Sequence, residues 1–190
     1  MSKTEQRLQD LGIILPQPVQ LPPGVVFPFP WVRIVGTRAL ISGHGPINPD
    51  GSLAQPLGKV GLDVSLEQGH GPINPDGSLA QPLGKVGLDV SLEQAYVAAR
   101  LTGLAILSSL QRELGTLDRI ATWTRIFGMV NSAAGFNQQP SVINGFTDLI
   151  IEVFGAEVGA HARSAVGLAE LPFNIPVEIE GEVELHPNDA

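Results

Sequence analysis

The spacing of apolar residues along the chain predicts two long helices and five strands. From Leu92 to about Leu114, and again from Pro140 to Phe154, apolar residues recur three or four positions apart. This spacing is typical of a helix with one buried face. Strands are indicated where apolar and polar residues alternate, or where β-branched and aromatic residues cluster. The predicted strands are 31–35, 38–42, 120–130, 163–169 and 177–185.

The order of these elements, ββαβαββ, implies an α+β fold with two helices packed on one face of a mixed β-sheet. We expect a single domain over residues 1–190, because this length suits one domain with a substantial core. On the other face of the sheet, only the last strand carries many polar residues. We therefore expect partner subunits to cover that face.

Residues 1–30 are predicted to form an N-terminal helix followed by a proline-rich arm. Thr4 to Leu11 has helical spacing, with Thr4 as the expected cap. The run from Pro16 to Pro30 is predicted to be extended, because proline cannot pair within a central strand. Gly115 and Gly155 are the expected ends of the two long helices.

Residues 43–68 and 69–94 are identical at every position. Two perfect copies indicate a segmental duplication, because repeat architectures require at least three units. Copy one continues the strand that ends at Ser42. Copy two leads into the first long helix, and its Ser91-Leu92-Glu93-Gln94 has the spacing of a capping box.

We therefore expect the strand to use copy one and the helix to use copy two. The surplus, about 57–82, is then expected to be a surface loop. The alternative is a slipped arrangement, in which Gly69-His70-Gly71-Pro72 replaces its equivalent beside a binding site and reshapes the entrance.

Composition narrows the classes of function. The formal net charge is −8 and the pI is about 4.8, so an acidic surface would repel phosphate backbones and we expect no nucleic-acid partner. The chain has no cysteine, which excludes disulfides, thiolate metal sites and a cysteine nucleophile. The polar N-terminus does not resemble a signal peptide, and the first long helix contains Arg100 and Gln111. We expect a soluble, cytoplasmic protein without a membrane span.

Arg163 and Glu178 are the candidate catalytic residues. In an extended strand His161, Arg163 and Ala165 share one face, and the planar fork of arginine matches a carboxylate. Glu178 can accept a proton or orient a water. Residues 171–176 have the composition of a short connection, which favours the two strands as neighbours. Both residues also fit a solvated surface, because the acidic and apolar residues of 177–185 alternate as in any half-exposed strand.

The segment His-Ala-Arg-Ser-Ala-Val-Gly-Leu-Ala-Glu-Leu-Pro at 161–172, followed by Val-Glu-Ile-Glu at 177–180, resembles the C-terminal signature of the Rid (YjgF) family. These proteins are enamine/imine deaminases, also labelled endoribonuclease L-PSP, and the most similar branch is described as chorismate-mutase-like. The resemblance covers about Trp31 to Leu185, interrupted by the duplication. It implies a homotrimer with a pocket at each subunit interface.

The resemblance also implies roles for individual residues. Arg163 would bind the substrate carboxylate, with help from backbone groups beside it at Ala165. Glu178 would position the attacking water. Ser42 and Gly43 match the loop that closes the pocket.

Two residues depart from the family pattern. Ala165 stands where many members have cysteine, but hydrolysis of an imine needs a held acid and an activated water, not a thiol. Asp148 falls at the place of an asparagine on the second helix, with Asn144 one turn earlier on the same face. An aspartate there would disfavour simple carboxylate substrates. His161 is a candidate second base or carboxylate partner, or else a packed strand residue.

No metal or cofactor is expected. The spacing of His44, His70, His161 and His186 does not suggest a metal centre, and the acidic residues at 178–184 fit a solvated or interface face. Gly-His-Gly-Pro-Ile-Asn does not satisfy a dinucleotide fingerprint.

Three functions remain open. The first is a cofactor-independent deaminase that hydrolyses a small enamine or imine acid to a carbonyl compound and ammonia. The second is a deaminase or hydrolase of a larger, ring-cleavage-derived amino acid in a catabolic pathway. The third is a trimeric protein that binds small acids without turnover.

Overall fold

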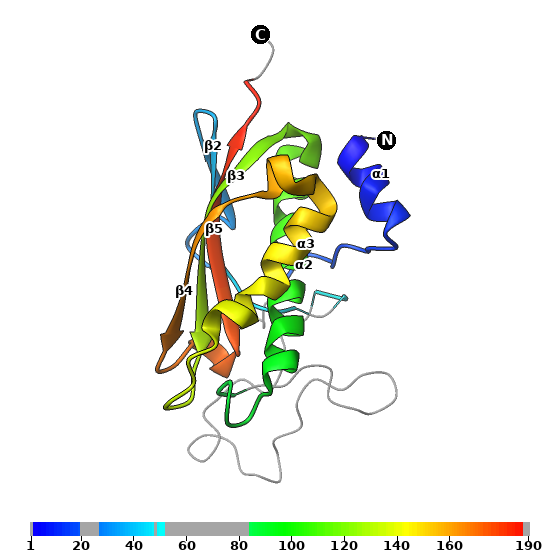
Figure 1. Ribbon diagram of the computed structural model, residues 1–190. Helices are drawn as coiled ribbons and strands as arrows, with labels where there is room; N and C mark the ends of the chain where they lie inside the picture. The colour runs from blue at the N-terminus through cyan, green and yellow to red at the C-terminus, as the bar shows by residue number, and fades with distance from the viewer. Residues whose placement is uncertain (1, 20–26, 48, 52–83, 188–190) are drawn as a thin grey trace.

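The computed structural model describes residues 2–19, 27–47, 49–51 and 84–187. One five-stranded sheet lies on one side of the domain and the long helices α2 and α3 lie on the other (Figure 1). The elements are α1 (Lys3–Asp10), β1 (Val32–Val35), β2 (Arg38–His44), α2 (Leu92–Leu114), η1 (Leu117–Arg119), β3 (Ile120–Asn131), α3 (Gln139–Gly159), β4 (Ala162–Leu168), η2 (Pro172–Asn174) and β5 (Val177–Leu185). The predicted α+β fold and the order ββαβαββ are confirmed.

The strand order in the sheet is β1-β2-β5-β3-β4. Only β3 and β4 run parallel, which makes the sheet mixed; the other neighbouring pairs are antiparallel. The expectation that β4 and β5 are neighbours is wrong, because β3 lies between them. The segment that joins them, which includes η2, therefore crosses the end of β3 instead of making a hairpin turn.

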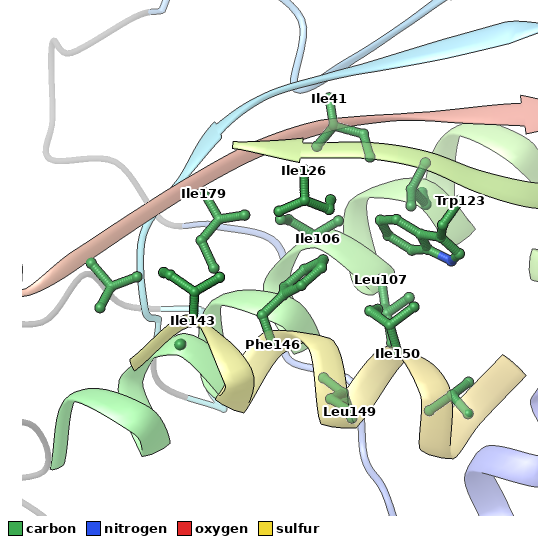
Figure 2. Close-up of a cluster of buried hydrophobic side chains, with 14 of the residues drawn as sticks. Ile41, Ile106, Leu107, Trp123, Ile126, Ile143, Phe146, Leu149, Ile150 and Ile179 are labelled. Carbon is green, nitrogen blue, oxygen red and sulfur yellow. The ribbon is translucent and has the colours of Figure 1, made fainter. Parts of the chain in front are cut away.

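The hydrophobic core fills the space between the sheet and the two long helices (Figure 2). Trp123 of β3 packs edge-on against Phe146 of α3, with 5.6 Å between the ring centroids. Each fully buried side chain of this size contributes roughly 1.5–3 kcal/mol to stability. The core side chains labelled in Figure 2 are Ile41, Ile106, Leu107, Trp123, Ile126, Ile143, Phe146, Leu149, Ile150 and Ile179.

Local sequence signals set the helix ends. Helix α2 has the predicted bounds, and Ser91 and Gln94 form the predicted capping box. Helix α1 begins earlier than predicted, because Ser2, not Thr4, accepts the capping hydrogen bond. Helix α3 does not end at Gly155. That glycine adopts φ 76°, which breaks the helical geometry, but helical residues resume and continue to Gly159.

The described ends of the duplicated segment come from different copies. Strand β2 ends at His44 in copy one, and the Ser91 cap of α2 belongs to copy two. The expected surplus loop, 57–82, lies outside the described residues, as does 20–26 of the proline-rich arm.

A buried polar network joins β2 to α2. His44 is 2% exposed, and its Nδ1 donates to the Ser42 carbonyl at 2.7 Å. Its Nε2 lies 2.9 Å from the Ser109 hydroxyl, which also accepts a hydrogen bond from Arg112 at 3.0 Å. Since a carbonyl can only accept, His44 carries its proton on Nδ1, and Ser109 donates to Nε2. Burial, opposed by the bond to Ser42 and assisted by the charge of Arg112, lowers the pKa of His44 to about 4.

The two long helices approach closely at Gly145 of α3. A Cβ placed there would lie 2.0 Å from the backbone oxygen of Tyr96 on α2. Replacing Gly145 by alanine should therefore destabilise the fold by about 2 kcal/mol. The overpacking penalty of 1–3 kcal/mol or more exceeds the gain of up to about 1 kcal/mol in helix propensity. Urea denaturation measures the change. Ser141→Ala, on the exposed side of α3, is the control and should change stability by less than about 0.5 kcal/mol.

The low pKa of His44 predicts a loss of stability in acid. Between the unfolded pKa of 6.5 and the folded value of about 4, the unfolded chain binds a proton that the folded chain excludes. Stability should therefore fall as the pH drops through this window, by roughly 3 kcal/mol in total. Urea denaturation at pH 7 and pH 4.5 should show a smaller loss for His44→Asn than for the wild type. Equal losses in the two proteins would contradict the assignment, because the carboxylates and other histidines are common to both.

Candidate functional site

Arg163 lies on the helix side of the edge strand β4. It pairs with the core residue Ile126 of β3, and paired residues in a sheet point to the same face. Its guanidinium donates to Thr147 Oγ1 at 2.9 Å, to Asn144 Oδ1 at 2.6 Å and to the carbonyl of Pro140 at 3.3 Å. All three acceptors are neutral. Among the described residues no carboxylate forms an ion pair with Arg163.

A chain of hydrogen bonds through His161 and Thr147 holds the Arg163 side chain in place. His161 Nδ1 donates to the carbonyl of Gly159 at 2.7 Å, which leaves Nε2 as an acceptor for the Thr147 hydroxyl at 3.1 Å. The Thr147 oxygen is then free to accept from Arg163. Burial, opposed by the bond to Gly159 and assisted by the charge of Arg163, lowers the pKa of His161. The lowered pKa favours the neutral His161 ring, and only the neutral ring can accept the hydrogen bond from Thr147.

The structure brings Asn144, not Asp148, to Arg163. Asp148 is exposed on α3 and accepts a hydrogen bond from the hydroxyl of Tyr96 on α2 at 2.8 Å. This bond is the main reason that the pKa of Tyr96 is raised. Asp148 is turned toward α2. Its carboxylate therefore interacts with Tyr96 on that helix and not with Arg163.

Glu178 lies on the opposite face of the sheet. It pairs with Met129 of β3, which alternates with the core residues Gly128 and Val130 and so points away from the helices. Its carboxylate packs against Gly43 of β2 so closely that a Cβ at that position would lie 2.0 Å from Oε1. Burial, assisted by the charge of Glu180, raises the pKa of Glu178. A half-buried carboxyl with a raised pKa is suited to proton transfer.

Ser42 directly precedes Gly43, and Ala165 lies two residues after Arg163. The Ser42 hydroxyl donates to the carbonyl of Pro30 at 2.8 Å, and its N–H donates to the carbonyl of Trp31 at 3.0 Å. Ser42 therefore ties the end of the proline-rich arm to β2, next to Gly43. Ala165 pairs with Gly128 and is half-buried on the helix side of β4, two residues beyond Arg163.

The candidate residues therefore form two groups on opposite faces of the sheet. We call Arg163, Asn144, Thr147 and His161 the arginine group, and Glu178 and Gly43 the glutamate group. The arginine group lies on the helix side at the β4 edge, whereas the glutamate group lies on the open face over β2 and β5. Within one chain, the sheet itself separates Arg163 from Glu178.

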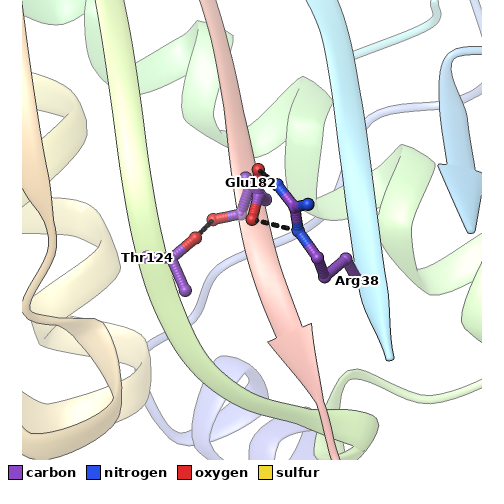
Figure 3. A network of polar contacts seen from close by, with 3 residues as sticks. All are labelled: Arg38, Thr124 and Glu182. Carbon is purple, nitrogen blue, oxygen red and sulfur yellow. Dashed lines mark hydrogen bonds and ion pairs between the residues drawn. The ribbon is translucent and has the colours of Figure 1, made fainter. Parts of the chain in front are cut away.

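One ion pair joins β2 to β5 on the open face, the face turned away from the helices. Arg38 of β2 forms a two-pronged ion pair with Glu182 of β5, with Nε 2.6 Å from Oε1, and Thr124 of β3 donates to the Glu182 carbonyl at 2.8 Å (Figure 3). The same face is hollowed nearby, where Leu40, Arg125, Phe127 and Glu180 line a shallow depression. Glu178 differs from Glu182 because it has no arginine partner among the described residues.

Thr147 was missed by the sequence analysis. It lies three residues after Asn144, a spacing that places two side chains on one helix face, so the signal was present once Asn144 was considered. Ser109 and Arg112 were missed for a different reason. They belong to the helix predicted from its apolar stripe, and nothing local links that helix to His44.

No group of three or more potential metal-binding side chains is found in the described ranges. None of the helices in the same ranges is long and apolar enough to cross a membrane.

Comparison with known proteins identifies the family. Residues 56–179 match the family model described as "YjgF/chorismate_mutase-like, putative endoribonuclease". A solved structure from Agrobacterium tumefaciens, the protein Atu1372 of unknown function, is 32% identical with a TM-score of 0.69, over 96% of this chain and 91% of that one. A structure from Shewanella oneidensis with the same endoribonuclease label is 26% identical with a TM-score of 0.71, over 97% of this chain and 100% of that one.

A curated relative, Protein TCP17 of Trypanosoma cruzi, is 48% identical over 89 residues, which are 47% of this chain. The match spans 56% of that protein's length. The family model and the Shewanella oneidensis structure carry an endoribonuclease label, and neither specifies a reaction for this chain. The resemblance inferred from the C-terminal motif is confirmed, and the chain belongs to the YjgF/chorismate mutase-like (Rid) family.

Proposed function

We propose that the protein is a cofactor-independent deaminase that hydrolyses small enamine or imine acids to a carbonyl compound and ammonia. The observation that carries this proposal is the state of Arg163, a permanent charge held in place by neutral hydrogen-bond acceptors. A guanidinium that is oriented but not neutralised is suited to a ligand carboxylate.

The neutral acceptors leave part of the guanidinium fork available. One terminal nitrogen donates to Thr147, and the other donates to both Asn144 and Pro140. Since arginine has five N–H donors in all, two of them stay available. Because the side chain is already ordered, binding an acid costs little further conformational entropy. The acid group of the substrate would thus be fixed before the reaction begins.

Glu178 is suited to both proton transfers of the reaction. In its protonated form it would deliver a proton to the enamine carbon, which converts the enamine to an iminium ion. The resulting carboxylate would take a proton from a water that attacks the iminium carbon, which restores the acid. The carbinolamine then transfers a proton from oxygen to nitrogen and expels ammonia, so that one enamine and one water yield one carbonyl compound and one ammonia. The raised pKa of Glu178 favours its protonated form more than in an ordinary glutamate, and this is the form that the first step requires.

The two groups can act on one substrate only if they come from different copies of the chain. Each chain would contribute its arginine group to one site and its glutamate group to another, which is the pattern of a head-to-tail ring. Apolar side chains at the β1 and β2 end of the sheet support such an assembly, since Val35 is 50% exposed and Leu40 is 36% exposed. We propose a homotrimer, in which three such sites close the ring.

The position of Asp148 bears on the substrate. In the sequence, Asp148 favoured the alternative of a larger amino acid, because an aspartate beside the arginine would repel simple acids. Asp148 is instead bound to Tyr96, and a neutral Asn144 contacts Arg163. This arrangement favours small carboxylates over the larger, ring-cleavage-derived substrates.

Replacing Arg163 by alanine should lower kcat/KM for ammonia release by roughly 100-fold, because a charge-assisted pair with the substrate is worth up to about 3 kcal/mol. The measurement is ammonia released from an enamine generated in situ, above the rate of spontaneous hydrolysis. Arg7→Ala, on the exposed side of helix α1, is the matched control and should retain full activity. Unchanged turnover in Arg163→Ala would refute the assignment. Saturable binding of a small acid by the wild type without any turnover would favour the non-catalytic binding protein.

Mixing two inactive variants tests whether the site is shared between chains. Arg163→Ala and Glu178→Gln should each be inactive alone. Unfolded together and refolded as mixed assemblies, they should recover roughly a quarter of the wild-type activity, because some sites combine an intact arginine group with an intact glutamate group. Mixtures of either variant with itself are the control. If the mixed assemblies remain inactive although they form, both groups must act within one chain.

A further inference from the structure

The peptide between Ser42 and Gly43 lies between the buried ring of His44 and the carboxylate of Glu178. Strand β2 leaves its regular pairing with β5 between Ile41 and His44. At this irregularity the Ser42 carbonyl accepts a hydrogen bond from His44 Nδ1 at 2.7 Å. On the other side of the same peptide, Glu178 packs against Gly43.

The direction of the Gly43 N–H follows from the planarity of the peptide. In a trans peptide the carbonyl of one residue and the N–H of the next point in opposite directions. Since the Ser42 carbonyl is directed to the His44 ring, the Gly43 N–H is directed away from it. Ser42 also uses its own N–H on the β1 side of the strand, where it bonds Trp31. The Gly43 N–H is therefore on the β5 side, which carries Glu178.

We propose that His44 is a positioning residue, whose ring holds the Ser42 carbonyl so that the Gly43 N–H faces the reaction site beside Glu178. This inference rests on the proposed function, because it deepens the role of the same site. A fixed N–H at this point can donate to an oxygen or nitrogen of the substrate that gains charge during hydrolysis.

The network behind His44 determines which ring nitrogen carries the proton. Arg112 has no lone pair to offer and can only donate, so the Ser109 oxygen accepts from it and the Ser109 hydrogen goes to His44 Nε2. Only the Nδ1–H tautomer satisfies this arrangement, and only that tautomer can donate a hydrogen bond from Nδ1 to the Ser42 carbonyl. Arg112 also donates to Ser108, whose hydroxyl bonds the carbonyl of Pro16 at 2.7 Å. The network thus extends from the N-terminal arm to the glutamate group.

Packing is the competing explanation for this histidine. The His44 ring is 2% exposed and lies 4.8 Å from the Trp31 ring, centroid to centroid. A role limited to packing requires volume at this position but no hydrogen bond to Ser42. The two explanations therefore differ in the effect of a side chain that fills the space without an N–H.

The test compares His44→Asn with His44→Leu in the full chain. Asparagine can place an N–H close to the position of Nδ1, whereas leucine fills the space without a polar atom. Gly43 can be observed selectively, because it is the only glycine in the sequence that follows a serine. Labelling serine carbonyls with ¹³C and glycine nitrogens with ¹⁵N therefore isolates its amide resonance.

In the wild type the Gly43 amide shift should follow the ionisation of Glu178 during a pH titration, and Glu178→Gln should abolish this response. His44→Asn should retain the response and stay within about 3-fold of wild-type kcat, whereas His44→Leu should lose the response and at least about 10-fold in kcat.

The proposal is overturned if His44→Leu keeps both the response and the wild-type kcat, or if the two variants lose them equally. Should His44→Leu fail to fold, Ser109→Ala takes its place, because it frees the ring to adopt the other tautomer; a full response in that variant would also overturn the proposal.

Failure of the proposed function gives a different result. If the wild type releases no ammonia from any enamine acid, the deaminase assignment fails. The amide titration does not depend on turnover, and it then decides by itself whether His44 orients the Gly43 N–H toward Glu178.

Discussion

Register within the sheet controls where every candidate side chain can act. Arg163 faces the helices because it is paired with Ile126, which the core holds in place. Glu178 faces away from them because it is paired with Met129 on the same central strand. A shift of one residue in either pairing would expose the whole apolar face of a strand, so this arrangement is as stable as the core itself. The separation of the two groups is therefore a fixed property of the fold.

Hydrophobic periodicity was sufficient to predict the elements of this fold. It placed α2 and β5 at their observed bounds and gave the correct order of helices and strands. It did not give the order of strands in the sheet, because alternation describes how one strand meets a core and carries no information about its neighbour. A short connection between 168 and 177 suggested adjacency, yet β5 inserts between β2 and β3, where its buried face is flanked on both sides.

The site was predictable only in part, for the same reason. The motif around Arg163 and the spacing to Glu178 identified residues with suitable chemistry, and Asn144 was named with them. What could not be read from the sequence is which contacts form between elements. Asn144 and Asp148 are one turn apart and share a helix face by spacing, yet one contacts β4 and the other contacts α2. Hydroxyl groups such as those of Thr147 and Ser109 gain their importance from partners distant in sequence, and no local pattern distinguishes them from other helical residues.

The duplicated segment has a consequence for how this gene can change. Strand β2 ends in copy one of the segment, and α2 begins at the end of copy two. Because the copies are identical, recombination that removes one of them restores the same junctions on both sides: Ser42 is still followed by Gly-His-Gly-Pro, and Ala95 is still preceded by Ser-Leu-Glu-Gln. Loss of one copy would therefore leave both anchoring sequences of the folded domain intact and shorten only the chain that connects them.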